Sequence, residues 1–253
     1  MPAKTQFHVA TSVYAGTSGW AYASWKPGFY PGNVPGTRFL EHYATRLNSV
    51  EVNYTFGKLP SDAMVSSWLA ATPETFRFSF KAPQRITHFS RLRDCGTHLA
   101  DFFASIAAVG KAGRMGAVLF QLPPNFKADA VRLSAFLGEA AMRGVARAAF
   151  EFRHASWLSE EVFETLRDHG AALCIAESDA LKTPQVQTGG FAYYRLRKSI
   201  YTTVEVAALA ATFASQSAGR DVYAYFKHGD APDGPLRAEA LLRTTLGLFG
   251  EEA

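Results

Sequence analysis

Eight short strand-like runs alternate with helical segments along this chain, and that alternation restricts its fold more than any other feature. Strands that alternate with helices form parallel sheets joined by right-handed crossovers. Eight such units predict an α/β fold that closes into a TIM (β/α)8 barrel, for which 253 residues is a typical length. The predicted strands cover residues 12–16, 49–53, 76–80, 117–121, 148–153, 171–176, 191–196 and 221–226.

Apolar residues at helical spacing fill most of the segments between these runs. Asp129 is placed to cap one helix, and Thr202 and Glu205 form a capping-box pattern that opens another. No full helical period lies between Asp179 and Phe191, so we expect the sixth helix to be short or missing. The predicted helices cover residues 39–47, 61–71, 95–112, 129–144 and 158–169, a segment opened by Thr202, and 237–249.

An open doubly wound sheet is the alternative fold. It usually carries a GxGxxG turn after its first strand, and Gly16-Thr-Ser-Gly19 matches that turn only in part. The barrel is therefore favoured. No linker or low-complexity tract divides the chain, which predicts one domain over residues 1–253.

Charge and cysteine content limit the classes of partner and compartment. There are 26 basic and 22 acidic side chains, a formal net charge of +4 and a pI near 9.1, values consistent with an anionic partner but equally with an ordinary soluble protein. The two cysteines are far apart without metal-ligand spacing. The chain shows no leader or apolar span, so we expect a cytoplasmic protein without membrane contact.

Polar pairs at the ends of several runs predict the site. Side chains two apart on a strand point the same way, and a TIM barrel carries its function at the carboxyl ends of its strands. One polar ring is therefore expected there, with four acidic and five basic members among the following residues: Glu51, Asn53, Lys81, Gln121, Glu151, Arg153, Glu177, Asp179, Arg195, Arg197 and Lys227. The alternative is a structural ion-pair network that plugs the barrel.

Roles within the ring follow from side-chain chemistry. Glu51 and Glu151 are the candidate general acid and base, because burial and like charge can separate the pKa values of two facing carboxyls. Arg153, Arg195 and Arg197 have planar guanidinium groups that fit phosphate or carboxylate oxygens in pairs. For each single residue an ion pair is the competing interpretation.

Aromatic and histidine residues complete the candidate set. One loop is crowded with the aromatic residues Trp20, Tyr22, Trp25, Phe29 and Tyr30. They can stack ligand rings, or they can form a hydrophobic lid over the barrel mouth or pack on the last helix. We assign Trp20 and His228, which follow the first and last strands, to ligand binding. No HxH or HExxH pair occurs, so no metal ligand is predicted.

Several ordered motifs resemble the YecE-like family, uncharacterised TIM-barrel proteins grouped as domain of unknown function 72. The motifs are Gly16-Thr-Ser-Gly-Trp20, Trp25-Lys-Pro-Gly-Phe-Tyr-Pro31, Val50-Glu-Val-Asn-Tyr-Thr-Phe56, Phe78-Ser-Phe-Lys-Ala-Pro83 and Phe226-Lys-His-Gly-Asp230. The resemblance runs from about Tyr14 to Leu248. It implies a barrel similar to the endonuclease IV and xylose isomerase group and a nucleic-acid role, without catalytic residues to carry over. The chain departs from the commonest pattern at Gly57 and at Lys227-His228.

The resulting functional hypothesis is a TIM-barrel protein that binds a phosphate-bearing ligand, such as nucleic acid or a nucleotide, with phosphoester hydrolysis through Glu51 and Glu151. One alternative is an anion-binding module without turnover. Another is a sugar isomerase or lyase that works by carboxylate proton transfer. The sequence assigns no cofactor, oligomeric state or pathway, and does not decide whether the protein is an enzyme.

Overall fold

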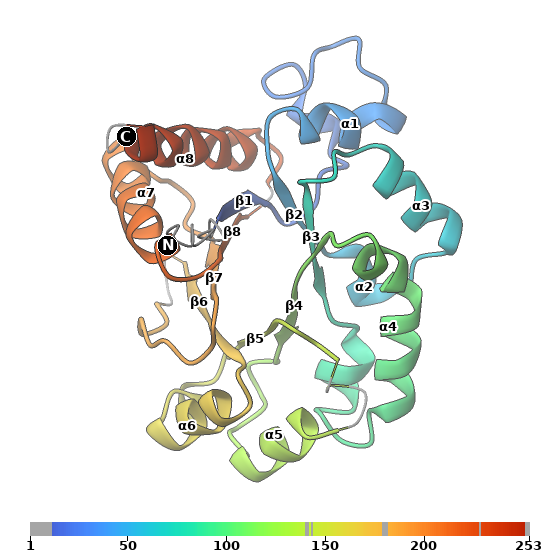
Figure 1. Ribbon diagram of the computed structural model, residues 1–253, viewed down its shortest axis with the longest axis vertical. Coiled ribbons are helices and arrows are strands. Elements are labelled where there is room, and N and C mark those ends of the chain that lie inside the picture. Colours follow the sequence, from blue (N-terminus) through green and yellow to red (C-terminus); the bar gives the residue numbers. More distant parts are fainter. Residues whose placement is uncertain (1–11, 140–141, 143, 179–181, 228, 251–253) are drawn as a thin grey trace, which may run out of the picture.

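The structure, a computed structural model, describes residues 12–139, 142, 144–178, 182–227 and 229–250. Within these residues eight parallel strands follow the order β1-β8-β7-β6-β5-β4-β3-β2 and curl into a nearly closed barrel with helices outside it (Figure 1). The predicted TIM barrel is confirmed. The strands are β1 (Val13–Thr17), β2 (Ser49–Val52), β3 (Arg77–Lys81), β4 (Met115–Gln121), β5 (Ala148–Glu151), β6 (Ala172–Glu177), β7 (Ala192–Leu196) and β8 (Val222–Phe226).

The α-helices occupy most of the predicted segments, with shifted ends. They are α1 (Phe39–Ala44), α2 (Tyr54–Gly57), α3 (Asp62–Ala70), α4 (Gly96–Lys111), α5 (Ala130–Leu137), α6 (Glu160–Asp168), α7 (Thr203–Ser217) and α8 (Asp233–Gly250). The predicted caps are confirmed: Asp129 accepts a hydrogen bond from the Arg132 N–H, and Thr202 with Glu205 forms the capping box of α7. No helix lies in the described part of the connection between β6 and β7, which comprises residue 178 and residues 182–191.

Two helix boundaries differ from the sequence prediction by more than three residues. The predicted helix 129–144 ends at Leu137, seven residues earlier than expected, because Gly138 caps it. The last helix begins at Asp233, before the predicted residue 237. The short helix α2 follows β2 directly and was not predicted, since four residues are too few for a helical period to show.

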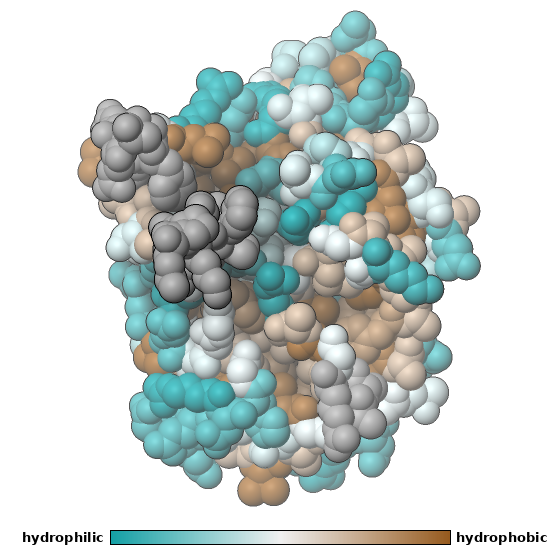
Figure 2. Space-filling model, viewed as in Figure 1, coloured by the Kyte–Doolittle hydropathy of each residue, from teal (hydrophilic) through white to brown (hydrophobic). Residues whose placement is uncertain are grey.

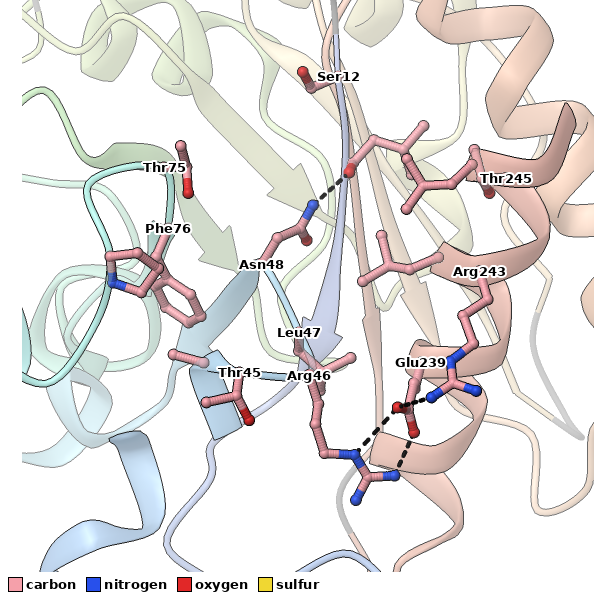
Figure 3. Close-up of a pocket in the computed structure, with 15 residues that line it drawn as sticks. Ser12, Thr45, Arg46, Leu47, Asn48, Thr75, Phe76, Glu239, Arg243 and Thr245 are labelled. Atoms are coloured by element: carbon pink, nitrogen blue, oxygen red, sulfur yellow. Dashed lines mark hydrogen bonds and ion pairs between the residues drawn. The ribbon is translucent and has the colours of Figure 1, made fainter. Parts of the chain in front are cut away.

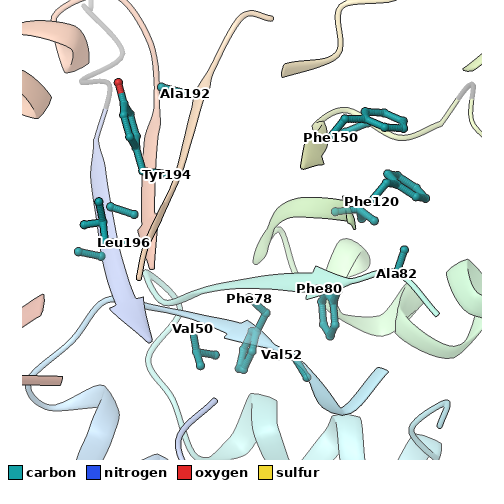
Figure 4. Packing of buried hydrophobic residues seen from close by; sticks show 14 of the residues in the cluster. Val50, Val52, Phe78, Phe80, Ala82, Phe120, Phe150, Ala192, Tyr194 and Leu196 are labelled. Carbon is teal, nitrogen blue, oxygen red and sulfur yellow. The ribbon is translucent and has the colours of Figure 1, made fainter. Parts of the chain in front are cut away.

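Alternation along the strands builds two hydrophobic layers. Outward residues such as Val50, Phe78 and Phe80 belong to the large cluster between the strands and the helices (Figure 4). Inward residues form a smaller cluster inside the barrel, made largely of alanine and tyrosine from β4 to β8. These inward side chains fill the barrel, so the polar residues that follow them on the same strands are held at its carboxyl end.

Side chains close the gap between β1 and β2, which are the two ends of the strand order. The Asn48 amide donates to the Val13 carbonyl and accepts from the Ala15 N–H, both at 2.9 Å. The Tyr43 hydroxyl accepts from the Thr17 N–H at 2.8 Å and donates to the Ser49 carbonyl at 3.0 Å. We call these contacts the β1–β2 seam. They satisfy backbone groups that a strand ladder would otherwise pair.

Gly16 explains why β1 can lie so close to β2. A Cβ atom built on Gly16 would lie 1.9 Å from the Ser49 carbonyl oxygen, so any larger residue would push the two strands apart. The first glycine of the Gly16–Gly19 motif therefore serves close backbone approach rather than a phosphate turn.

Candidate functional site

The centre of the candidate site is a buried ion-pair cluster that joins three strands across the barrel. Arg195 on β7 donates to Glu51 on β2 through Nε (3.0 Å) and Nη2 (2.6 Å), and to Glu151 on β5 through Nη1 (2.5 Å). The relative exposures of the three side chains are 1%, 0% and 3%. We call this the Glu51–Arg195–Glu151 cluster. Residues predicted from alternation alone meet here.

Glu51 is held by four hydrogen bonds. Besides the two from Arg195, Ser18 Oγ donates to Oε1 at 2.9 Å and the Tyr193 hydroxyl donates to Oε2 at 2.7 Å. Burial acts to raise the pKa of Glu51, but Arg195 and these donors outweigh it and the pKa is lowered. Glu51 is therefore an ionised carboxylate at neutral pH.

Glu151 is held in a similar way but lies nearer to solvent-facing cations. Gln121 Nε2 donates to Oε2 at 2.8 Å, and Arg153 Nε donates to Oε1 at 3.1 Å. Burial again favours the neutral acid, but the charges of Arg195, Arg153 and Arg197 prevail and lower the pKa of Glu151 to about 2.

Two cations beside the cluster have no such partners. Among the described residues neither Lys81 Nζ nor the Arg197 guanidinium makes a hydrogen bond or ion pair, and Arg197 Nε is buried without a partner. Burial, and then Arg195, lower the pKa of both groups, that of Lys81 to about 8. The Lys81 ammonium lies 3.9 Å from the centre of the Phe56 ring, a contact that offsets part of this effect.

The remaining ring residues are distributed around this centre. Asn53 Nδ2 donates to the Ser18 carbonyl at 3.3 Å, whereas its Oδ1 is buried without a partner in the described residues. Lys227 is exposed. Trp20 packs edge-on against Trp68 and lines, with Asn53, a cavity of about 250 Å³ beside the ends of β1 and β2.

Glu177 is not brought into the cluster. Cys174 and Ala176 point into the barrel, so Glu177 is one residue out of step, and its Oε1 lies 4.0 Å from Lys198 Nζ. The sequence prediction placed Glu177 inward because it considered only the spacing of Glu177 and Asp179. It did not follow the alternation of the apolar residues earlier in β6. The predicted site residues Asp179 and His228 lie outside the described residues.

The aromatic loop is mainly structural. Trp25, Phe29 and Tyr30 are buried and pack on one another and on α1, and Trp25 Nε1 donates to the Gly229 carbonyl at 3.0 Å. These contacts make the three residues part of the hydrophobic core, and their burial excludes stacking of ligand rings on them. Trp20 and Tyr22 remain partly exposed.

No group of three or more histidine, cysteine, aspartate or glutamate residues within the described chain is arranged to hold a metal ion. His88 packs edge-on against Phe56, and His154 Nδ1 lies 2.8 Å from Ser156 Oγ. Burial, with Lys81 and Arg153, lowers the pKa of His88. None of the described helices has the length and apolar content that crossing a bilayer needs.

Sequence reasoning missed two partners of Glu51, namely Ser18 and Tyr193. Tyr193 had a usable signal, because it stands two residues before Arg195 and therefore faces the same way. Ser18 lies in the Gly16–Gly19 turn, where no regular period shows the direction of a side chain.

A cavity of about 500 Å³ opens at the opposite end of the barrel (Figure 3). It is lined by residues that precede the strands, among them Ser12, Asn48 and Phe76, and by Glu239 and Arg243 of α8. Glu239 there pairs with both Arg46 and Arg243. Because the amino ends of barrel strands serve stability rather than catalysis, we place the candidate site at the charged carboxyl end.

Comparison with known sequences identifies relatives over much of the chain. The family model "Protein of unknown function DUF72" matches residues 14–248. "UPF0759 protein YecE" of Escherichia coli K12 is 33% identical over 114 residues, 45% of this chain and 39% of YecE. "UPF0759 protein YunF" of Bacillus subtilis 168 is 28% identical over 156 residues, 60% of this chain and 54% of YunF. These alignments thus span about two fifths to half of the curated relatives.

Solved structures show the same fold. A DUF72 family protein from Thermotoga maritima MSB8 has a TM-score of 0.78 and 25% identity, with 93% of this chain and 99% of that chain covered. A DUF72 family protein from Enterococcus faecalis V583 has a TM-score of 0.73 and 18% identity, with 92% and 96% covered.

Proposed function

This chain belongs to the DUF72 family, proteins of unknown function, and from its own site we propose that it binds a phosphate-bearing ligand. The ligand would bind at the carboxyl end of the barrel. Arg153 and Arg197 are the phosphate-binding groups in this proposal, and Lys81 lies beside them. The Glu51–Arg195–Glu151 cluster lies beneath them as a rigid support.

The observation that carries the proposal is the unpaired Arg197. Its Nε is buried without a partner in the described residues, and its pKa is lowered by burial and by neighbouring Arg195. Arg197 is half-buried, and the nearby carboxylates of Glu51 and Glu151 offset only part of this effect on its pKa. An anion in direct contact would stabilise the charged guanidinium further. A ligand anion at Arg197 would make that contact.

The charge balance of the site supports an anionic ligand. Two carboxylates, Glu51 and Glu151, stand against the cations Arg195, Arg153, Arg197 and Lys81. Arg195 already uses its donors on both glutamates, whereas Arg153 binds Glu151 only through Nε and is 37% exposed. The guanidinium groups of Arg153 and Arg197 thus remain for the oxygens of a phosphate, which guanidinium groups bind in a bidentate manner.

Phosphoester hydrolysis through Glu51 and Glu151 stays a prediction. Both carboxyls have lowered pKa values, so each suits a general base better than a general acid. Their oxygens all accept hydrogen bonds from Arg195, Arg153, Ser18, Tyr193 or Gln121. These contacts favour a positioning role, and therefore an anion-binding module without turnover over a hydrolase built on this pair.

Calorimetric titration of purified protein with pyrophosphate, a nucleoside monophosphate and a short single-stranded oligonucleotide tests the proposal. The Arg197→Met variant removes the unpaired charge while it keeps side-chain length. We expect its affinity for the bound phosphate compound to fall by about 10- to 100-fold, since one charged hydrogen bond contributes roughly 1.5–3 kcal/mol.

Arg167→Met is the matched control, because Arg167 pairs with Glu160 on the surface of α6. Its loss should leave binding unchanged. Absence of binding by all three compounds, or equal affinity in Arg197→Met and the wild type, would refute the proposal. Binding of the oligonucleotide with a steep loss of affinity in salt would identify nucleic acid as the ligand class.

A further inference from the structure

Lys81 differs from the other cations of the site in its surroundings. It is the last residue of β3 and points the same way as Ser79, whose Oγ accepts from the Tyr225 hydroxyl inside the barrel at 2.8 Å. The Lys81 side chain therefore reaches the barrel mouth from within. It is half-buried, so its amine is sheltered yet accessible.

Charged groups from several elements surround this amine. Arg195 from β7 and Arg153 after β5 repel a proton on Nζ, whereas Glu51 from β2 and Glu151 from β5 attract it. The charge of Lys81 also helps to lower the pKa of His88, which lies on the neighbouring π-helix (Arg85–Phe89). Burial together with the two arginines outweighs the carboxylates, and the pKa of Lys81 falls to about 8. A substantial fraction of the amine is therefore neutral near physiological pH.

Phe56 connects this amine to a cavity that Lys81 itself does not line. Phe56 covers Nζ with its ring, and the same residue lines a cavity of about 400 Å³ together with Pro83, Arg85 and Phe89. Arg153 and Arg197 provide the phosphate contacts proposed above. The site thus joins a sheltered amine, an aromatic wall and an anion-binding pair within one barrel mouth.

We propose that Lys81 is a nucleophile that forms an imine with the carbonyl carbon of a phosphate-bearing aldehyde or ketone, such as an open-chain sugar phosphate. This inference rests on the proposed phosphate binding and adds the substrate class. The Nζ lone pair attacks the carbonyl carbon to form a C–N bond. The carbonyl oxygen then leaves as water with two protons from the amine, so no oxidant or reductant is needed.

Borohydride trapping tests the inference. Pyridoxal 5′-phosphate, a phosphate-bearing aldehyde, serves as the probe, and borohydride reduces any imine to a stable secondary amine. Peptide mass mapping of the wild type is expected to find the label on Lys81. The initial labelling rate should rise through pH 8, with a plateau above pH 9.

Two lysine variants control for general reactivity. Lys81→Arg keeps the positive charge but removes the nucleophile, and should reduce labelling at least tenfold while it retains pyrophosphate binding. Lys127→Arg changes an exposed lysine between β4 and α5 and should label like the wild type. Labelling that is spread over other lysines, or unchanged in Lys81→Arg, would overturn the inference.

Comparison with pyridoxal, which lacks the phosphate, separates this inference from the proposed function. If pyrophosphate binds but Lys81 stays unlabelled, the imine proposal fails and phosphate binding stands. If both aldehydes label Lys81 equally and pyrophosphate does not bind, Lys81 is a nucleophile but the phosphate site is refuted. If pyridoxal 5′-phosphate labels Lys81 at least tenfold faster than pyridoxal does, both the phosphate site and the imine proposal are supported.

Discussion

At the scale of single residues, the site combines satisfied and unsatisfied charges. Arg195 has two buried carboxylate partners, whereas Arg197, two residues further on, has none among the described residues. The ion pairs of Arg195 hold three strands together. The unpaired charge of Arg197 lowers the free energy of unfolding, and a bound anion would raise it again. The difference between these two arginines separates the support of the site from its binding groups.

Acid stability depends on the carboxylates of this cluster. The pKa of Glu151 is lowered to about 2 from an ordinary value of 4.5, and that of Glu51 is lowered too. As pH falls below 4.5, the unfolded chain takes up protons first, so stability is lost between about pH 4.5 and pH 2. Glu151 alone contributes on the order of 3 kcal/mol above this window.

Urea unfolding at several pH values between 5 and 2.5 measures this loss. Glu151→Gln should be less stable than the wild type at pH 6, and its free energy of unfolding should fall less steeply with acid. Glu160→Gln, which alters an exposed ion pair on α6, should follow the wild-type curve. Parallel curves for Glu151→Gln and the wild type would contradict the assignment.

At the scale of elements, alternation and capping explain why the strands and helices were predictable. The outward Val50, Phe78 and Phe80 and the inward alanines of β5 and β6 repeat with period two, and that pattern sets both the strands and the direction of Glu51, Glu151 and Arg195. It failed at Glu177, where the register of the strand decided the direction, and at α5, where a local turn at Gly138 ended the helix.

The α7 capping box gives a test at this scale. Thr202 Oγ1 accepts from the Glu205 N–H at 3.2 Å, and Glu205 Oε2 accepts from the Thr202 N–H at 2.8 Å. Thr202→Ala should lower the free energy of unfolding by about 1 kcal/mol. Thr203→Ala, at the next exposed position, should stay within about 0.5 kcal/mol. Equal effects of the two substitutions in chemical denaturation would show that the cap is not stabilising.

At the scale of the whole molecule, the sequence predicted a barrel but not how it closes (Figure 1). The number and order of units come from patterning along the chain, whereas the β1–β2 seam depends on Asn48, Tyr43 and Gly16, which carry no periodic signal. On the face shown in Figure 2, hydrophilic residues cover much of the outer edge of the molecule, and hydrophobic residues are exposed mainly on the side of α3 and α4. The motifs that contain Gly16 and Asn53 lie on either side of the β1–β2 seam.

Asn48→Ala tests the seam. It leaves the Ala15 N–H and the Val13 carbonyl without their partners, and each such loss costs about 1–3 kcal/mol. We expect lower stability in urea and faster hydrogen exchange at the Ala15 amide. Asn125→Ala, at an exposed loop position, should change neither, and native exchange at Ala15 in Asn48→Ala would argue against a closing role.

The part of the β1–β2 seam that Asn48 forms has a consequence for evolution and engineering. Asn48 precedes β2, and Glu51 lies three residues further on the same short segment, so slack at the base of the barrel is transmitted to the carboxylate at its mouth. Arg195 would then keep its hydrogen bond to Glu151 but weaken those to Glu51, and the affinity of the site for an anion would change. Affinity can therefore be retuned from the far end of the molecule, without altering a single group that touches the ligand.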